Sequence, residues 1–541
     1  MHFPARHQRR RLWALGVAAT LASGVTASAA QDLPISAARA PGTMPGAGTP
    51  VGVPIRQDAG VRRVQDVPVS PSPAPPAASL PGTMDAAPAL PFGVDRSEIG
   101  NQPADLSLPA ADRPIGGGGA TIEAQNTEAA EATAANEPKR IQNLLGFEES
   151  PVKIYGWIQN SFTGNANGHS GGFNNGVNPN FKANQWMGNQ YYLVVENPLE
   201  QSDEVNFGFR VDNLFGNDWQ FNFMQGMYNG AFKNGSFAGY DTAQLYGEVH
   251  LPDPTGATKG IDVKGGRWYT LAGYEQVPAI ARPLLSVPYM FNYGQPFTHL
   301  GVMTTWHLTD KINFYNGAIN GWDRWQNQSY TWGYMGGFSW TGNEDKTSLA
   351  FTTASGPQQY PRFLPSNQPI YATGYLNVPS VAGTTNTGYN NNNRTLFTTV
   401  LTHKWTDKLT QVMETDQAWE KNVPGLASPV VNGVIQNASA KNATWYSFGN
   451  WFLYNFNDKL TGVWRSEVFW DTTGVRTYNV QDGQFRGDRF YEQTLGLIYK
   501  PIPNIWIRPE ARYDWTQFTN YYDNGTKKSQ LTLGFDIILL F

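Results

Sequence analysis

Long segments in which apolar and polar residues alternate one by one are the feature that most restricts the fold of this chain. In Val205–Asp212 the odd positions are apolar, and Leu531–Phe541 carries an apolar residue at every odd position up to the last residue. A period of two predicts a β-strand with one apolar face. Most of these segments span ten to thirteen residues, whereas strands of globular sheets have about five or six. A tilted strand that crosses a membrane needs about 9–11 residues, so segment length favours a membrane barrel.

Sixteen such segments follow residue 150, beginning near residues 152, 187, 204, 242, 261, 298, 311, 331, 347, 394, 408, 444, 459, 489, 504 and 530. Short connections such as Thr309-Asp310 alternate with long polar loops such as Leu271–Pro296 and Ser355–Asn393. An up-and-down barrel with short periplasmic turns and long outer loops has this alternation. We predict an all-β, antiparallel transmembrane barrel of about sixteen strands. Fourteen and eighteen are the neighbouring counts, and a soluble β-sandwich or propeller is the competing architecture.

The residues before the barrel have a different character. Arg9–Arg11, the apolar stretch Leu12–Ala22 and the small residues Ala27–Ala29 predict a signal peptide over residues 1–30. Eleven apolar residues are too few to span a bilayer, which disfavours the alternative of a membrane anchor. The general secretory route is favoured over the twin-arginine route because that route carries folded cargo. Residues 31–140 are rich in Pro and Ala and predict a disordered periplasmic spacer, either a tether or a passive link. Residues 141–541 then form the barrel domain.

Composition excludes several classes of function. The chain has no Cys, which excludes disulfide scaffolds, iron–sulfur clusters, zinc–thiolate sites and cysteine nucleophiles. A net charge of −4 offers no basic field for nucleic acid. The mean hydropathy of −0.42, with no apolar run of 18 residues, excludes a helical membrane protein. It does not exclude a barrel, whose alternating strands average to polar.

Several stretches resemble the bacterial beta-barrel porin-2, or OmpL-like, family of the planctomycete type. They are Phe209–Asp218, Gly273–Glu275, Gly294–Val302, Asn316–Asp323, Trp464–Asp471 and Ile507–Asp514. The resemblance covers about residues 145–541 and implies an outer-membrane porin without naming a solute or a catalytic residue. A terminal aromatic such as Phe541 also resembles the signal that the outer-membrane barrel assembly machinery reads. We therefore expect localisation in the outer membrane, contact with its lipid, and passive diffusion of small hydrophilic solutes.

If the apolar face of each strand meets lipid, the opposite face lines the lumen. A charge on the lipid side at the bilayer midplane would cost about 2–4 kcal/mol, which supports this assignment. Such charges either filter solutes or merely solvate the wall. Four Arg face seven carboxylates in the nominated set, which predicts a mild cation preference. The predicted pore-lining residues are Arg210, Asp212, Glu248, His250, Glu414, Asp416, Arg465, Glu467, Arg508, Glu510, Arg512 and Asp514.

The third long loop, Leu271–Pro296, is the candidate constriction, because in general sixteen-strand porins the third loop narrows the pore. It contains Glu275 and Arg282, and an ordinary outer cap is the alternative. Trp306, Trp340, Trp405, Trp470 and Trp515 fall near strand ends and predict interfacial girdles rather than a sugar-stacking slide.

The alternatives to a porin are a non-conducting structural barrel or adhesin and, less favoured, a barrel enzyme. None of the seven His is followed at the second position by Ser, as in the outer-membrane phospholipase, and the His residues are too scattered for a metal motif. We therefore expect no catalytic residues, no metal and no cofactor. By analogy with general porins, a homotrimer is the expected assembly.

Overall fold

The computed structural model describes residues 150–165, 172–220, 238–325, 332–357, 393–424 and 440–541, together with a few isolated positions between these ranges. The predicted signal peptide and spacer lie outside the described residues. None of the helices in the described part of the chain has the length and apolar character needed to cross a membrane.

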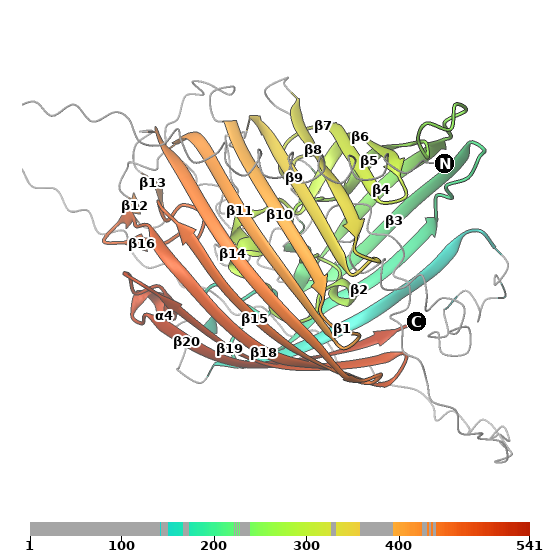
Figure 1. Ribbon diagram of the computed structural model, residues 1–541. Helices are drawn as coiled ribbons and strands as arrows, with labels where there is room; N and C mark the ends of the chain where they lie inside the picture. Colours follow the sequence, from blue (N-terminus) through green and yellow to red (C-terminus); the bar gives the residue numbers. More distant parts are fainter. Residues whose placement is uncertain are drawn as a thin grey trace, which may run out of the picture. The chain divides into compact units, whose positions relative to one another are not determined.

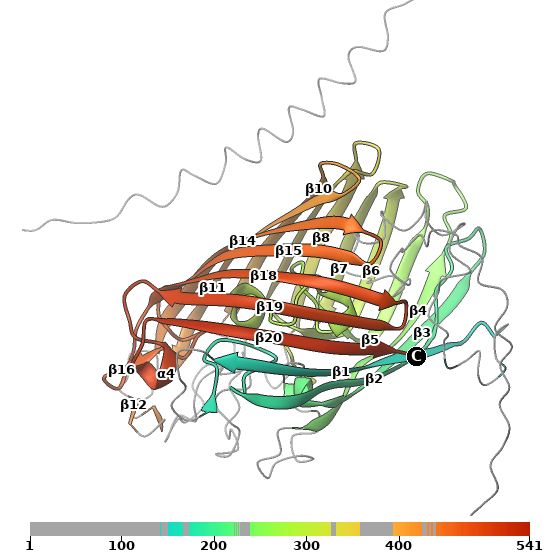
Figure 2. The ribbon, with the colours of Figure 1, turned by 90° about the horizontal axis from the view of Figure 1, so that it is seen from below.

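Sixteen of the described strands form a single closed barrel in which each strand pairs antiparallel with its neighbours (Figures 1 and 2). The first eight strands are β1 Lys153–Asn165, β2 Gln185–Asn197, β3 Asn206–Gly216, β4 Gly239–Leu251, β5 Ile261–Tyr269, β6 Thr298–Thr309, β7 Ile312–Ile319 and β8 Gly333–Gly342. The remaining eight are β9 Thr347–Pro357, β10 Asn393–Lys404, β11 Leu409–Pro424, β14 Ala440–Asn457, β15 Leu460–Asp471, β18 Asp488–Ile502, β19 Ile505–Thr516 and β20 Ser529–Leu540.

These strands confirm the predicted fold class. Each begins within four residues of its predicted position, and the largest difference is at β14, predicted from residue 444 and observed from Ala440. Short two-stranded hairpins extend two of the outer loops, formed by β12 (Val430–Val431) with β13 (Val434–Ile435) and by β16 (Val480–Gln481) with β17 (Gln484–Phe485).

The barrel closes where the last strand meets the first. Phe162 of β1 lies opposite Phe535 of β20 in the register. The last residue continues the pairing: the amide of Gly156 donates to the carbonyl of Phe541 (2.9 Å), and the amide of Phe541 donates to the carbonyl of Gly156 (3.0 Å). A side chain at Gly156 would collide with the Phe541 ring, so this glycine makes room for the terminal aromatic. Phe541 is therefore part of the barrel seam.

The two faces of the wall separate as the alternation predicts. On β20, Leu533 and Ile537 are 54 % and 39 % exposed on the outer face, whereas Asp536 between them is fully buried. Four of the five predicted girdle tryptophans, Trp306, Trp340, Trp405 and Trp470, are also exposed. The apolar face thus points away from the lumen, as a lipid-facing wall requires.

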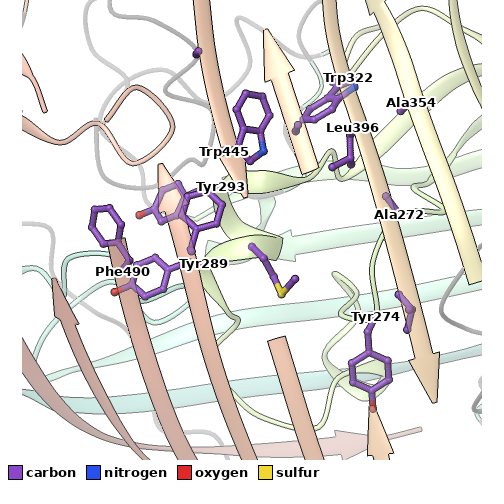
Figure 3. Close-up of a cluster of buried hydrophobic side chains, with 14 of the residues drawn as sticks. Ala272, Tyr274, Tyr289, Tyr293, Trp322, Ala354, Leu396, Trp445 and Phe490 are labelled. Carbon is purple, nitrogen blue, oxygen red and sulfur yellow. The ribbon is translucent and has the colours of Figure 1, made fainter. Parts of the chain in front are cut away.

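The lumen is less polar than the sequence pattern suggests. Figure 3 shows an aromatic cluster inside the barrel, with Trp445 and Phe490 of the wall beside Tyr289 and Tyr293 of the loop between β5 and β6. Trp322, from the loop after β7, packs edge to face against Trp445, with their ring centroids 6.2 Å apart. The packed core of this barrel therefore lies between the inner wall and the loops that enter it.

Candidate pore and constriction loop

The loop that joins β5 to β6, residues 270–297, is called loop 3 here. It contains the short turns η3 (Ala279–Ala281) and η4 (Met290–Gly294), which lie within the ring of strands (Figure 1). Hydrogen bonds along the length of loop 3 join it to β2, β9, β11, β14, β15 and β19. It therefore crosses the lumen and follows the wall on the far side from its own strands.

Three arginines of the wall hold main-chain carbonyls of loop 3. A carbonyl accepts a stronger hydrogen bond from a charged donor than from a neutral one. The donor–acceptor pairs are Arg465 Nη1 to Ser286 O (2.6 Å), Arg508 Nη1 to Ala279 O (2.9 Å) and Arg282 O (2.6 Å), and Arg512 Nη1 to Val287 O (2.6 Å).

Carboxylates of the same wall accept main-chain amides of loop 3. Glu467 accepts from both Tyr289 N (2.6 Å) and Met290 N (2.5 Å). Glu510 accepts from Ser286 N (3.0 Å), and Glu414 accepts from Tyr274 N (2.9 Å). Because these bonds involve the main chain, they fix the path of the loop whatever side chains it carries.

Of the two charged residues predicted within loop 3, Glu275 is bonded to the wall and Arg282 to Asp218 of the short 3-10 turn η2 (Asn217–Gln220) after β3. Glu275 accepts from Trp451 Nε1 (3.0 Å) and pairs with Arg465 (3.4 Å). Burial raises the pKa of Glu275, against the lowering effect of Arg465. Arg282 pairs with Asp218 at 3.3 Å. Both loop residues are buried, so they hold the constriction in place.

A second set of charges lies on β2–β5. Arg210 contacts Glu196 (3.0 Å) and Asp212 (2.7 Å), and Lys264 contacts Glu248 (3.2 Å). The Arg210 side chain keeps 12 % of its surface exposed, compared with 0–1 % for the three arginines that hold loop 3. On this side the wall charges pair mainly with one another.

The predicted pore-lining residues therefore divide into two groups. Those on β3 and β4 are Arg210, Asp212, Glu248 and His250. The eight on β11, β15 and β19 all contact loop 3: Asp416 accepts from Gln295 (2.9 Å), Asp514 accepts from the Tyr289 hydroxyl (2.9 Å), and the other six make the bonds given above. Whether any of the twelve touches a passing solute stays a prediction.

Sequence reasoning missed several charged groups of the wall. Asp536 pairs with Arg508 (2.5 Å), and Glu492 pairs with Arg465 (2.9 Å). Both lie at the inward parity of their strands, so the alternation could have identified them. Arg267, which pairs with Asp241 (2.6 Å), could not be assigned by parity: Lys264 and Arg267 are three residues apart and both buried, so the alternation of β5 fails around Gly266 (φ +134°).

Comparison with known proteins identifies the family of this chain. Residues 151–541 match the family model described as "Putative beta-barrel porin-2, OmpL-like". Among solved structures, the chain is similar to the outer membrane channel DcaP of Acinetobacter baumannii, with 9 % identity over 72 % of this chain and 97 % of that chain and a TM-score of 0.45. It is also similar to an anion-selective porin from Comamonas acidovorans, with 9 % identity, 72 % and 99 % coverage and a TM-score of 0.45.

A third similar structure is OprB of Pseudomonas putida, with 11 % identity over 75 % of this chain and 99 % of that chain and a TM-score of 0.44. No curated protein matches the chain. The family match spans the whole barrel and confirms the resemblance seen in the sequence. The chain belongs to the beta-barrel porin-2, OmpL-like family and is an outer-membrane porin.

Proposed function

We propose that small hydrophilic solutes diffuse through this porin along the β2–β5 side of the lumen, past the edge of loop 3. The observation that carries the proposal is the exposure of Arg210, which contrasts with the full burial of the arginines under loop 3. The arginines that are bonded to the loop main chain have almost no free surface to offer a solute. On β2–β5 the Arg210 side chain keeps 12 % of its surface exposed and Glu196, Lys264 and Glu248 keep 5 %, so this is the side that we assign to the solute.

Loop 3 sets the size limit in this proposal. It is held on the wall by ionic hydrogen bonds to its main chain, from Ala279 to Met290. A loop fixed at so many points presents a constant outline to solutes. The passage is therefore narrower than the barrel itself, and it lies off the barrel axis.

Planar-bilayer recording of the folded full chain tests the proposal. We expect discrete ohmic conductance steps. Glu248→Gln on the proposed path should change the reversal potential in a KCl gradient, and Asp514→Asn under loop 3 should not. Silence with intact folding would contradict diffusion and favour the structural or adhesin barrel, for which the lumen must be plugged.

We also propose that this porin has no enzymatic activity. Among the described residues, no group of three His, Asp or Glu side chains is arranged to hold a metal ion. The buried carboxylates under loop 3 accept hydrogen bonds from the loop, which gives them a structural role. A lipid hydrolysis assay on the folded porin should show no turnover above background.

Export and assembly follow from parts of the chain at its two ends. We propose that residues 1–30 direct secretion, that residues 31–140 form a periplasmic spacer, and that residues 141–541 insert into outer-membrane lipid through the barrel assembly machinery. The terminal Phe541 supports the last step because its ring packs on Gly156 at the seam. A homotrimer remains the expected assembly, and mass measurement of the detergent-extracted porin tests it.

A further inference from the structure

Two histidines share one carboxylate at the end of the barrel that carries the short turns. His250 of β4 approaches Asp262 of β5 with Nδ1 2.6 Å from Oδ1. His307 of β6 approaches the same side chain with Nε2 2.8 Å from Oδ2. The three residues lie on neighbouring strands at their periplasmic ends, far from loop 3 in the register. His250 is one of the predicted pore-lining residues, but the proposed diffusion path is argued from Arg210 and not from this trio.

The turn between β2 and β3, residues 198–205, is bound to this trio and is called turn 1. The carbonyl of Ser202 lies 3.1 Å from Nε2 of His250. The side-chain amide of Gln201 lies 2.9 Å from Nε2 of His307 and 3.2 Å from Oδ2 of Asp262. Neighbouring strands are about 4.8 Å apart, so turn 1 reaches three strands beyond its own to make these contacts. It therefore lies against the inner wall at the periplasmic mouth.

The partners of His250 determine its protonation state. A carboxylate and a main-chain carbonyl can only accept hydrogen bonds. Each of them faces a different ring nitrogen of His250, so both nitrogens must carry a hydrogen for both bonds to form. A neutral imidazole has only one such hydrogen and would leave Asp262 or Ser202 without its bond. The observed contacts are thus satisfied only by the imidazolium form of His250.

His307 differs in this respect. Its Nδ1 faces the side-chain amide of Asn313 (2.8 Å), and its Nε2 lies near the amide of Gln201 as well as Asp262. An amide can present either its oxygen or its nitrogen to a neighbour. The surroundings of His307 therefore accept the neutral or the charged ring, which makes it the natural control for His250.

The other charged groups around the trio are either paired with one another or exposed on turn 1. Two residues deeper on the same strands, Lys264 contacts Glu248 at 3.2 Å. On the adjoining turns, Lys259 contacts Asp310 at 3.1 Å, and the remaining charged residues of turn 1, Glu200, Asp203 and Glu204, are exposed to solvent. Each pair is neutral in total, so Asp262 is the charge that acts on His250 most directly.

We propose that His250 is a proton-dependent latch that holds turn 1 against the periplasmic mouth. Imidazole is the side chain whose ordinary titration lies between about pH 5 and 8. At the acidic end the imidazolium bridges Asp262 and the Ser202 carbonyl, and turn 1 is fixed. In its neutral form His250 gives up the Ser202 bond, and turn 1, then tethered through Gln201 to His307 and Asp262, gains mobility. Turn 1 has eight residues, whereas the turns between β14 and β15 and between β18 and β19 have two, so once released it has room to move.

The absence of Cys from the chain makes a single spin label selective. We would place it at the exposed Asp203 of turn 1 as Asp203→Cys and record its mobility in the folded porin at about pH 5 and about pH 8.5, on either side of ordinary imidazole titration. The expected result is an immobilised label at the lower pH and a mobile one at the higher pH. His250→Asn should give a mobile label at both values, and His307→Gln should preserve the transition.

A label at Ala257→Cys, in the turn between β4 and β5, is the matched control. Hydrogen bonds from Thr255 and Thr258 hold the pKa of Asp253 in that turn well below its usual range, so this carboxylate does not titrate across the experiment. Its mobility should not change with pH. A label at position 203 that ignores pH in folded porin would overturn the latch, as would equal loss of the transition in His307→Gln. These readouts do not depend on conduction, so a failed latch leaves the proposed diffusion path untouched.

Discussion

The two sides of the inner wall carry the same kinds of residues and use them differently. On β11, β15 and β19, arginines and carboxylates bond to the main chain of loop 3, as Arg465 and Glu467 show. On β2–β5, the charges bond across strands to one another, as Lys264 does to Glu248. A buried charge needs a partner in either place, because its desolvation is otherwise too costly. The partner decides whether the charge supports the fold or faces the passage.

This difference limits what a count of inward charges can predict. Alternation places a charge on the inner face but does not reveal whether a loop will cover it. Eight of the twelve nominated lining residues contact loop 3, so a selectivity argument that weights all twelve equally gives too much influence to buried groups. The charges of β2–β5 should dominate selectivity, and those under loop 3 should dominate stability.

The largest loss of stability is expected from Arg465→Ala. Arg465 is fully buried between Glu492 (2.9 Å) and Glu275 (3.4 Å) and also holds the Ser286 carbonyl. Removing one partner of a buried ion pair typically costs about 3–5 kcal/mol. Urea unfolding of the lipid-reconstituted porin, followed by tryptophan fluorescence, should show a loss of that order. Arg210→Ala is the comparison and should cost less because Arg210 is partly solvated. Equal losses would erase the distinction between the two sides.

A smaller effect is expected from Glu467→Ala, which removes the acceptor of two loop amides, Tyr289 N and Met290 N. An unsatisfied buried donor costs about 1–3 kcal/mol. The loop should loosen locally, and single-channel recordings should become noisier while the barrel stays folded. Glu467→Gln keeps an acceptor oxygen and should restore much of the quiet trace. Identical traces for the three proteins would show that Glu467 does not position the loop.

The next prediction concerns ion selectivity and compares two nearly isosteric substitutions that each remove one negative charge. Glu248→Gln removes one carboxylate beside Lys264 on the open side, and Asp514→Asn removes one beside Arg512 under loop 3. A carboxylate raises the local cation concentration only where solution reaches it. Reversal potentials should therefore move toward weaker cation preference for Glu248→Gln and stay unchanged for Asp514→Asn. A larger change for Asp514→Asn would place the solute path on the other side of loop 3.

The sequence predicted the barrel well because membrane strands obey a local rule. Lipid on one side and a packed interior on the other impose a period of two on every strand, and Leu533, Asp536 and Ile537 show it within five residues. Turn positions follow from the gaps between such runs. Strand positions and parity need no knowledge of distant contacts, whereas the pairing of Phe541 with Gly156 at the seam was not predicted.

The candidate site depended on contacts that no local rule contains. Glu467 lies about 180 residues from the amides of Tyr289 and Met290, so its role appears only when loop 3 is folded against β15. Inward aromatics such as Trp445 break the expected polar lining because they pack on that loop rather than meet water. The interior of the barrel is a tertiary interface, and alternation describes only one of its two surfaces.

The smallest expected effect is the ion selectivity of the unmodified porin, which we predict to be weak. On the open side, Arg210 and Lys264 face the carboxylates Glu196, Asp212 and Glu248, which leaves a small excess of negative charge. Each of these charges is paired within about 3 Å, so the field beyond the wall is weak. Salt screens what remains over about 8 Å at physiological ionic strength. Reversal potentials in KCl gradients should therefore show a mild cation preference that fades as the salt concentration rises. A preference for chloride, or a cation preference that persists in concentrated salt, would mean that charges other than those of β2–β5 govern the passage.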